Sequence, residues 1–329
     1  MTRTPKVSNP SATLATNCEH ASNLALLERV GTVHLRQRLG IEADAEARVF
    51  HQGWNFFHIE NWYSFHSMLR ITLRAALVHR RGVRNAMAIR VERHDIVVEG
   101  LPEAFDQFTM LHISDLHLDM HPDIPHALIE SVRDVDYDAV VLTGDFRART
   151  SGSIHPSMEA MCRVRTHLRD PVYAVLGNHD SIRMVPPLEE MGVRMLLNES
   201  MPIRRGTGEI FLAGIDDPHY YRADNFEKAC EDIPSDRVAI LLAHSPEIYR
   251  HAAHAGFHVL LCGHTHGGQI CLPGGYPLTY NARCPRRYCA GSWRYRSLAG
   301  YTSRGSGVSI VDVRFNCPPE ITLHRLIRA

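Results

Sequence analysis

Short apolar segments recur along the chain from residue 108 onward, and stretches with helical periodicity separate several of them. The apolar runs cover residues 108–113, 138–143, 171–176, 209–215, 237–243 and 257–262, and the helical stretches cover 124–133, 157–168 and 246–255. Strands that alternate with helices predict an α/β fold whose inner strands are largely parallel. Alternating residues predict two edge strands near residues 86–100 and closing antiparallel strands at 308–315 and 320–326.

Polar residues of metal-binding type follow five of these predicted strands. They are Asp115 and His117, then Asp145, then Asn178 and His179, then His244, and finally His264 and His266. In open α/β sheets, binding sites form at the carboxyl ends of strands. The sequence therefore predicts that these side chains, although distant along the chain, converge on one site.

The number of donors exceeds what a single ion needs. With His179 held back, two Asp, one Asn and four His remain, and two ions that share a carboxylate would use all seven. Paired ions roughly 3.5–4 Å apart stabilise both the attacking and the leaving oxygen of a phosphoryl displacement. A nitrogen and oxygen donor set suits Mn, Fe, Zn or Co, and we expect two divalent ions, with Mn preferred.

Five motifs occur in the order of a known family: ISDLH (113–117), LTGD (142–145), VLGNHD (175–180), HSPE (244–247) and GHTHGGQI (263–270). They resemble the calcineurin-like metallophosphoesterases, and within them the bacterial branch whose last motif is GHTHGGQ. The segments SRGSG (303–307) and RFNCPPEITL (314–323) are similar to that branch as well. The resemblance covers about residues 88–329. It implies two mixed β-sheets packed face to face with flanking helices.

The resemblance also implies roles for individual residues. It assigns Asp115, His117, Asp145 and His266 to the first metal, and Asp145, Asn178, His244 and His264 to the second, with Asp145 bridging. The family's nucleophile is a hydroxide that bridges the two metals, whose charge lowers the pKa of bound water. His179 matches the family's histidine that stabilises the transition state or protonates the leaving oxygen.

One position departs from the family pattern. Many relatives carry GDxxDR, in which the second acid orients the catalytic histidine. This chain has GDFRAR, with Ala148 at that place. Asp180 is a candidate replacement, although capping of the next helix is the alternative role for it.

Four arginines near the motifs are candidate phosphate-binding residues: Arg147, Arg149, Arg183 and Arg304. An arginine binds a phosphate through two parallel hydrogen bonds. A solvated loop arginine is the alternative at each position. His112 and His258, in or beside strands, are expected to be packed residues rather than ligands.

The N-terminal part lies outside the resemblance. We expect a loose tail at 1–20, a helical and aromatic extension at 21–85, and the metallophosphoesterase domain at 86–329. Within the extension, residues 23–49 predict a helix that stops at Gly40, and residues 64–84 predict a basic amphipathic helix beside an aromatic cluster at 50–65. Residues 50–85 would either lie on an anionic membrane surface or pack on the main domain.

Composition narrows the partners and the location. The chain carries 36 Lys and Arg and 36 Asp and Glu, so its formal charge is zero, which argues against nucleic acid as the main partner. The first residues contain no apolar secretory core. We therefore expect a cytoplasmic protein, with peripheral contact at the inner membrane as an extension of that prediction.

The sequence predicts a dinuclear metal-dependent phosphoesterase that hydrolyses a phosphodiester or pyrophosphate bond. One alternative is a lipid-linked pyrophosphate hydrolase that resembles the UDP-2,3-diacylglucosamine hydrolases and acts at the inner membrane surface. An alternative from another class is a non-enzymatic metal-binding scaffold.

Overall fold

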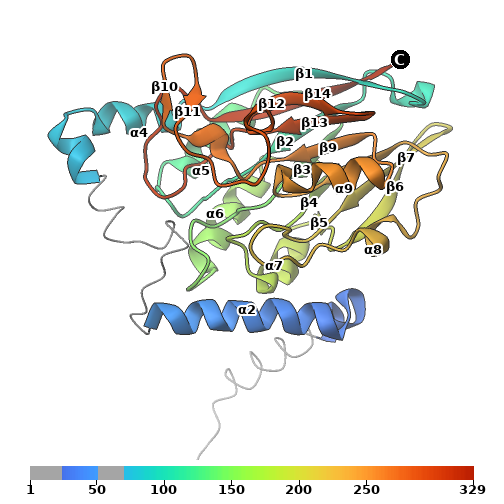
Figure 1. Cartoon of the computed structure of the whole chain (residues 1–329), viewed down its shortest axis with the longest axis horizontal. Coiled ribbons are helices and arrows are strands. Elements are labelled where there is room, and N and C mark those ends of the chain that lie inside the picture. The colour runs from blue at the N-terminus through green and yellow to red at the C-terminus, as the bar shows by residue number, and fades with distance from the viewer. Residues whose placement is uncertain (1–23, 51–69) are drawn as a thin grey trace, which may run out of the picture.

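The computed structural model describes residues 24–50 and 70–329. Within these residues, two six-stranded β-sheets form a sandwich with helices on its outer sides (Figure 1). Side chains from both sheets share one buried apolar cluster, in which Ile96 and Val141 of one sheet meet Leu212 and Leu261 of the other. The predicted pair of mixed sheets with flanking helices is confirmed.

The first sheet has the strand order β1-β14-β2-β3-β4-β5. Its strands are β1 (Arg90–Val98), β2 (Thr109–Ile113), β3 (Ala139–Leu142), β4 (Val172–Ala174), β5 (Val193–Met195) and β14 (Glu320–Arg328). Strands β2 to β5 run parallel, with Leu111 opposite Val140 and Val140 opposite Val172. Strand β14 is antiparallel to β2 and parallel to β1. The carboxyl ends of β2, β3 and β4 therefore lie at one edge of the sheet.

The second sheet has the order β12-β13-β9-β8-β7-β6. Its strands are β6 (Glu199–Arg205), β7 (Gly208–Gly214), β8 (Ala239–Leu242), β9 (Val259–Cys262), β12 (Gly291–Tyr295) and β13 (Leu298–Thr302). Strands β7, β8, β9 and β13 are parallel, and the edge strands β6 and β12 are antiparallel to their neighbours. A two-stranded ribbon of β10 (Cys271–Leu272) and β11 (Tyr276–Pro277) follows β9.

Helices cover the outer face of each sheet. The first sheet is covered by α5 (Ile124–Val132), α6 (His155–Arg165) and α7 (Val185–Glu190), whose Leu128, Met161 and Leu188 join its apolar cluster. The second sheet is covered by α8 (Phe226–Cys230) and α9 (Tyr249–His254). Short 3₁₀ turns connect these elements: η2 (Glu103–Phe105), η3 (Ile182–Met184), η4 (Pro246–Ile248), η5 (His266–Gly268) and η6 (Arg286–Tyr288).

Two N-terminal helices pack on this sandwich. Helix α2 (Thr32–Phe50) runs along the outside of the molecule, and Leu35 joins the apolar cluster of the first sheet together with Leu26 and Val30 of the preceding helical turn (Figure 1). Helix α4 (His79–Met87) lies against residues 313–315. A Cβ on Gly82 would lie 2.6 Å from Val313 Cβ, so α4 can pack this closely against Val313 only because residue 82 is a glycine.

The structure corrects several expectations about local structure. Gly40 does not stop the helix, because α2 continues to Phe50, and the break falls instead at Gly31, where φ is +85°. The helix expected at 64–84 is interrupted after residue 75 by a turn with Leu77 at a φ of 57°. One strand, β1, replaces the two expected edge strands.

The prediction of a strand at 308–315 is also wrong, because no strand forms there. The backbone carbonyls of Ser309 and Val311 accept hydrogen bonds from the Gln269 side chain, and the segment pairs only through a bridge between Ile270 and Phe315. The strand at 320–326 is confirmed as β14. The tail at 1–20 and most of the aromatic cluster lie outside the described residues. Among the helices of the described ranges, none combines the length and the hydrophobicity needed to span a bilayer.

Candidate metal centre

The seven candidate ligands lie together where strands from both sheets end. Asp115 and His117 follow β2, Asp145 follows β3 and Asn178 follows β4. From the other sheet, His244 follows β8, and His264 and His266 follow β9. None of the seven is more than 7% exposed. The convergence expected from the strand pattern is therefore present, and it joins the two sheets.

One group of ligand atoms comes from Asp115, His117 and His266, which lie within 4.8 Å of one another. His117 Nε2 lies 3.1 Å from His266 Nε2, and the latter lies 3.4 Å from Asp115 Oδ1. Ser114 Oγ and the backbone N–H of His264 donate to the Asp115 carboxylate and fix its orientation.

A second group comes from Asp145, His244 and His264. His244 Nε2 lies 3.2 Å from His264 Nδ1 and 3.3 Å from Asp145 Oδ2. Asn178 Oδ1 joins this group at 2.9 Å from His244 Nε2. Every candidate ligand assigned to the second metal thus contributes an atom to one small cluster.

Asp145 lies between the two groups. Its Oδ1 accepts the backbone N–H of His179 at 2.9 Å, whereas Oδ2 lies 3.6 Å from His117 Nε2 and 3.3 Å from His244 Nε2. The same oxygen therefore faces one histidine of each group. This is the placement that a bridging carboxylate requires.

Hydrogen bonds to backbone carbonyls fix three of the rings. His117 Nδ1 donates to Arg147 O at 2.8 Å, His244 Nδ1 donates to Thr143 O at 2.7 Å, and His264 Nε2 donates to Asn281 O. Because a carbonyl can only accept, the proton of each neutral ring lies on its outer nitrogen and the lone pair points into the cluster. His266 differs, since its outer nitrogen faces Arg314 Nη2 at 3.3 Å.

Lone pairs crowded in this way repel one another unless a cation or a proton lies among them. Carboxylate, amide and imidazole donors match Mn²⁺, Fe²⁺, Zn²⁺ or Co²⁺. The residues therefore fit two divalent cations, with a neutral Asn and two carboxylates leaving the pair net positive toward an anionic substrate.

The charges of the ligand residues are strongly coupled. Burial by itself disfavours a charged His244, but the carboxylates of Asp145 and Asp115 raise its pKa to about 10. Burial likewise opposes a charged Asp145, yet His244 and His179 hold its pKa well below the usual value. Burial, with Asp145 close by, raises the pKa of Asp115. The cluster thus holds positive charge against Asp145 even before a metal is considered.

Backbone conformation at the cluster is unusual for residues with side chains. Asp115, His117, Asp145, His264 and His266 all have φ between 41° and 70°. This left-handed region is unfavourable for such residues and is concentrated at functional sites. The turns also need a close approach: a Cβ on Gly177 would lie 2.2 Å from Asp145 Oδ1. Gly177 therefore leaves the space that the Asp145 carboxylate occupies.

His179 lies beside both groups. Its Nε2 lies 3.9 Å from Asp145 Oδ2, and its ring meets the His117 ring edge-on with centroids 5.2 Å apart. Position 148 carries no acid, and the backbone N–H of Ala148 donates to Asp119 Oδ1 at 2.7 Å.

Asp180 takes neither of the two roles expected for it. Its carboxylate accepts backbone N–H groups from Asp145 at 2.7 Å, Phe146 at 2.9 Å and Gly177 at 2.8 Å. The cap of the following turn η3 is Ser181 instead. Burial raises the pKa of Asp180 to about 6, and Asp145 acts in the same direction. Asp180 thus shapes the turn that presents Asp145.

The four candidate phosphate-binding arginines are placed differently from one another. Arg147 is buried, and its guanidinium donates to the carbonyls of His179, Thr150 and Gly152. Arg304 binds the carboxylates of Glu320 and Glu92. Acceptors within the protein therefore bind both side chains, and contact of Arg147 and Arg304 with a phosphate stays a prediction.

The other two arginines are more exposed. Arg183 lies 3.8 Å from Glu42 Oε2 with half of its side chain exposed, and Arg149 is exposed. His112 is fully buried, as expected of a packed residue, and its Nε2 lies 2.8 Å from Thr143 Oγ1.

Three features near the site were not foreseen from the sequence. Arg38 and Glu42 of α2 reach residues 180–182, and Arg314 is fully buried against the loop of His266. His219 packs on the ring of His264 with centroids 4.1 Å apart. The sequence around a charged residue does not show that it will be buried. Only Arg38 and Glu42 carry a signal, because their i and i+4 spacing is that of an ion pair on one face of a helix.

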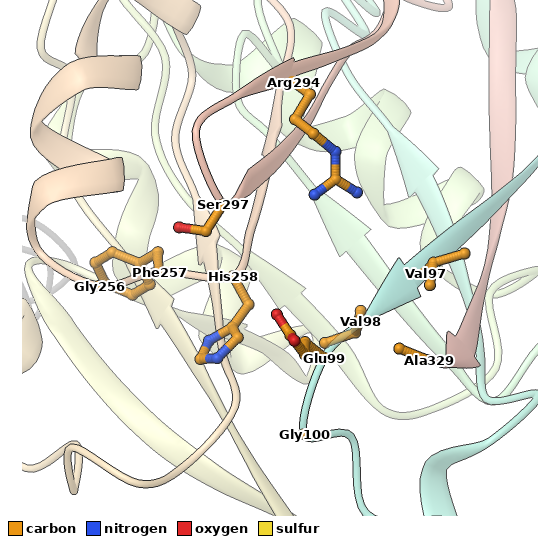
Figure 2. Close-up of a pocket in the computed structure, with 10 residues that line it drawn as sticks. All are labelled: Val97, Val98, Glu99, Gly100, Gly256, Phe257, His258, Arg294, Ser297 and Ala329. Carbon is orange, nitrogen blue, oxygen red and sulfur yellow. The ribbon is translucent and has the colours of Figure 1, made fainter.

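A separate pocket lies at the opposite end of the second sheet (Figure 2). It has a volume of about 410 Å³ and lies beside residues 256–258, which directly precede β9. The candidate ligands His264 and His266 follow the other end of that strand. Its polar lining includes Glu99, His258 and Arg294. None of the candidate metal ligands contributes to it.

A sandwich of two mixed sheets with two groups of metal-binding residues at the strand ends is the architecture of a metal-dependent phosphoester hydrolase. Comparison with known proteins agrees. The calcineurin-like phosphoesterase family matches residues 108–268, from the start of β2 to η5. The uncharacterized metallophosphoesterase YkoQ of Bacillus subtilis is 31% identical over 254 residues, covering 74% of this chain and 92% of that protein.

Two further relatives are more distant. The phosphodiesterase YaeI of Escherichia coli is 27% identical, covering 67% of this chain and 82% of that protein. A transmembrane protein with a metallophosphoesterase domain from Danio rerio is 26% identical, covering 78% of this chain and 61% of that protein. The chain belongs to the calcineurin-like metallophosphoesterase family and is a metal-dependent phosphoester hydrolase. The alternative of a non-enzymatic scaffold is therefore not retained.

Proposed function

We propose that this enzyme hydrolyses a phosphodiester or pyrophosphate bond with two divalent cations, Mn²⁺ being preferred. The observation that carries this proposal is the position of Asp145 Oδ2, which faces His117 and His244 from the two ligand groups. Asp115, His117 and His266 would hold one cation, and Asn178, His244 and His264 the other. The pair would supply Lewis acidity to the phosphoryl group and make water a better nucleophile at neutral pH.

His179 would act on the side of the leaving group. Its ring is nearly buried and lies beside His117 and Asp145, so it borders the space between the ligand groups. From there an imidazolium can stabilise charge on the phosphoryl oxygens or donate a proton to the leaving oxygen. Arg149 and Arg183 are exposed near the motifs of Asp145 and His179, and they are the best placed of the four predicted arginines for contact with the substrate.

Hydrolysis of bis-p-nitrophenyl phosphate by the purified protein with Mn²⁺ tests the proposal. Asp145→Asn and His264→Ala should each lower kcat by at least about a hundredfold, since both remove a ligand from the cluster. His126→Ala, which changes an exposed histidine on α5, is the matched control and should keep wild-type activity. A metal-loaded wild-type protein that cleaves no member of a broad panel of phosphodiesters and pyrophosphates would contradict the proposal.

A second candidate, a lipid-linked substrate, has one specific observation in its favour. Ile71 and Leu77 beside α4, and Leu272, Tyr276 and Leu278 at the β10–β11 ribbon, are all exposed apolar residues. Helix α4 lies against Val313 through Gly82. Ile270, which directly precedes β10, forms a bridge with Phe315, so both elements contact the segment 313–315. Exposed apolar side chains with nearby arginines such as Arg74 and Arg81 suit an anionic bilayer surface.

Co-sedimentation with phosphatidylglycerol vesicles tests this candidate. The wild-type protein should sediment with anionic vesicles, and Leu77→Asp with Leu278→Asp should weaken sedimentation strongly. Equal recovery with neutral phosphatidylcholine vesicles, or no effect of the two substitutions, would remove the candidate. Neither result affects the test with soluble diesters.

A further inference from the structure

Helix α2 lies outside the stretch that matches the family, yet two of its side chains reach the loop that carries His179. The match begins at residue 108, whereas α2 covers Thr32–Phe50. In α2, Arg38 is 0% exposed and Glu42 is 3% exposed, which is rare for charged residues. Burial of a charge is costly unless it is paired, so the partners of these two side chains matter.

Arg38 binds the main chain next to His179. Its Nη2 donates to Asp180 O at 2.9 Å, and its Nε lies 3.3 Å from Asp216 Oδ2. The guanidinium also lies over the ring of Tyr221, 3.5 Å from its centroid. Asp216 is in turn held by His34 of the same helix at 2.6 Å. The charge of Arg38 is therefore compensated by Asp216, while one donor is committed to the loop.

Glu42 binds the next two residues of the same loop. Ser181 Oγ donates to Glu42 Oε2 at 2.6 Å, and the backbone N–H of Ile182 donates to Glu42 Oε1 at 2.8 Å. Hydrogen bonds to a charged acceptor are stronger than those between neutral groups. Together with Arg147, which binds His179 O, buried side chains thus contact each of residues 179–182.

These contacts bear on the missing acid of the GDxxDR motif. The side chain of Ala148 cannot form a hydrogen bond, so it cannot orient His179 as the acid of relatives is expected to. A ring can also be aimed by fixing the backbone that carries it. Arg38, Glu42 and Arg147 all bind that backbone. The first two reach it because α2 packs its apolar face on the first sheet.

We propose that α2 is a positioning element of the active site, in which Arg38 and Glu42 hold residues 180–182 and thereby set the direction of His179. The two residues act through the loop and do not contact the substrate. The kinetic part of this inference rests on the proposed role of His179 at the leaving group. The structural part, that α2 orders the loop, does not depend on any activity.

Hydrogen exchange of the full-length protein tests the structural part. The variants are Arg38→Met and Glu42→Gln, with Arg38→Lys as the conservative form and Arg36→Met, an exposed position on the same helix, as the matched control. Peptides covering residues 177–184 should exchange at least about tenfold faster in Glu42→Gln and Arg38→Met, because exchange reports local opening. Arg36→Met should match the wild type, and Arg38→Lys should fall between.

Leaving-group dependence tests the kinetic part. Phenol is a poorer leaving group than p-nitrophenol, so hydrolysis of diphenyl phosphate depends more on protonation of the leaving oxygen. In Glu42→Gln and Arg38→Met, kcat should fall about tenfold on diphenyl phosphate and less than about threefold on bis-p-nitrophenyl phosphate, with KM and bound metal unchanged. A simple loss of stability would lower both rates equally through the active fraction.

The outcomes separate this inference from the proposed function. A wild-type protein without diesterase activity refutes the proposed function, and the exchange experiment then still decides whether α2 orders the loop. If Arg38→Met does not fold, Glu42→Gln and Arg38→Lys carry the test. Wild-type exchange at 177–184 in folded Glu42→Gln, or equal losses of kcat on the two diesters, would overturn the inference.

Discussion

Asp180 accepts the backbone N–H of Asp145 at 2.7 Å, so the residue that follows His179 shapes the turn of the carboxylate shared by both ligand groups. A second hydrogen bond runs in the opposite direction between the same two loops, because Asp145 Oδ1 accepts the backbone N–H of His179. The two loops that follow β3 and β4 therefore form one hydrogen-bonded unit. Helix α2 is attached to the same unit through Arg38 and Asp180 O.

Asp180→Asn should weaken metal binding although Asp180 is not a ligand. An amide has one acceptor oxygen, and its NH₂ group would face either the N–H donors of Asp145 and Gly177 or the N–H donor of Phe146, which leaves at least one buried donor unpaired. We expect a loss of about 1–3 kcal/mol in the free energy of unfolding and less than one bound metal per chain. Urea unfolding and metal analysis measure both. Two tightly bound metals in the variant would show that the turn does not need this carboxylate.

Gly177→Ala should disrupt the cluster more severely. The added Cβ would lie 2.2 Å from Asp145 Oδ1 and 2.5 Å from its backbone nitrogen, so the turn of Asp145 must move. Diesterase activity should fall at least about a hundredfold. Gly40→Ala is the matched control, since a Cβ there meets no atom within 4 Å, and it should stabilise α2 by about 0.5–1 kcal/mol. Retention of activity in Gly177→Ala would contradict the geometry.

Acid should destabilise the protein partly through a row of histidines between the sheets. Burial lowers the pKa of His112 to about 3, and it lowers that of His324 well below its usual value. His112 Nδ1 and His324 Nε2 are 3.2 Å apart, with His94 and Tyr301 packed on His324. An unfolded histidine binds a proton near pH 6.5, whereas the folded one does not. The stability is therefore complete above pH 6.5 and is lost as the pH falls toward 3.

Substitution of His112 measures this effect. A group with these two pKa values contributes about 2 kcal/mol of stability at pH 7.5 that is absent at pH 5. The difference in unfolding free energy between pH 7.5 and pH 5 should therefore shrink by about 2 kcal/mol in His112→Gln. His167→Gln, an exposed histidine, should leave the difference as it is in the wild type. An unchanged difference in His112→Gln would mean that His112 is protonated in the native protein.

Metal removal should lower thermal stability, because a ligand that binds only the folded state stabilises it by mass action. At a free Mn²⁺ concentration of 100 times Kd, the stabilisation is about 2.7 kcal/mol per site. Differential scanning calorimetry with EDTA and with added Mn²⁺ should show a rise in Tm on metal addition. The rise should be smaller in His244→Ala, which lacks one ligand of the second group. An equal rise in both proteins would place the metal elsewhere.

The sequence predicted the ligand cluster because parallel strands place the residues that follow them at one edge of a sheet. The residues that follow β2, β3 and β4 lie at one edge of the first sheet, and those that follow β8 and β9 lie at one edge of the second. The packing of the two sheets then brings Asp115 and His264 together, although 149 positions separate them. The chain has no comparable rule for helix α2. Its contacts with Asp180 and Asp216 join residues 142 and more positions apart, and nothing local marks Arg38 as buried.

Local patterns failed where tertiary contacts decided the outcome. The segment 308–315 alternates like a strand, but its carbonyls are used by Gln269, and Arg314 takes the carbonyls around it. Gly40 has the residue type of a helix end, but α2 continues beyond it because Leu35 and Arg38 of the same helix are buried against the rest of the protein. The position of Arg147 and Arg304 near the motifs also did not reveal that acceptors within the protein bind both side chains.

The two-metal arrangement is tested most directly by anomalous diffraction from crystals of the Mn²⁺-loaded protein. Two cations that share Asp145 should give two peaks roughly 3.5–4 Å apart. One should lie against Asp115, His117 and His266, and the other against Asn178, His244 and His264, with Asp145 in contact with both. A single peak, or two peaks of which Asp145 touches only one, would contradict it.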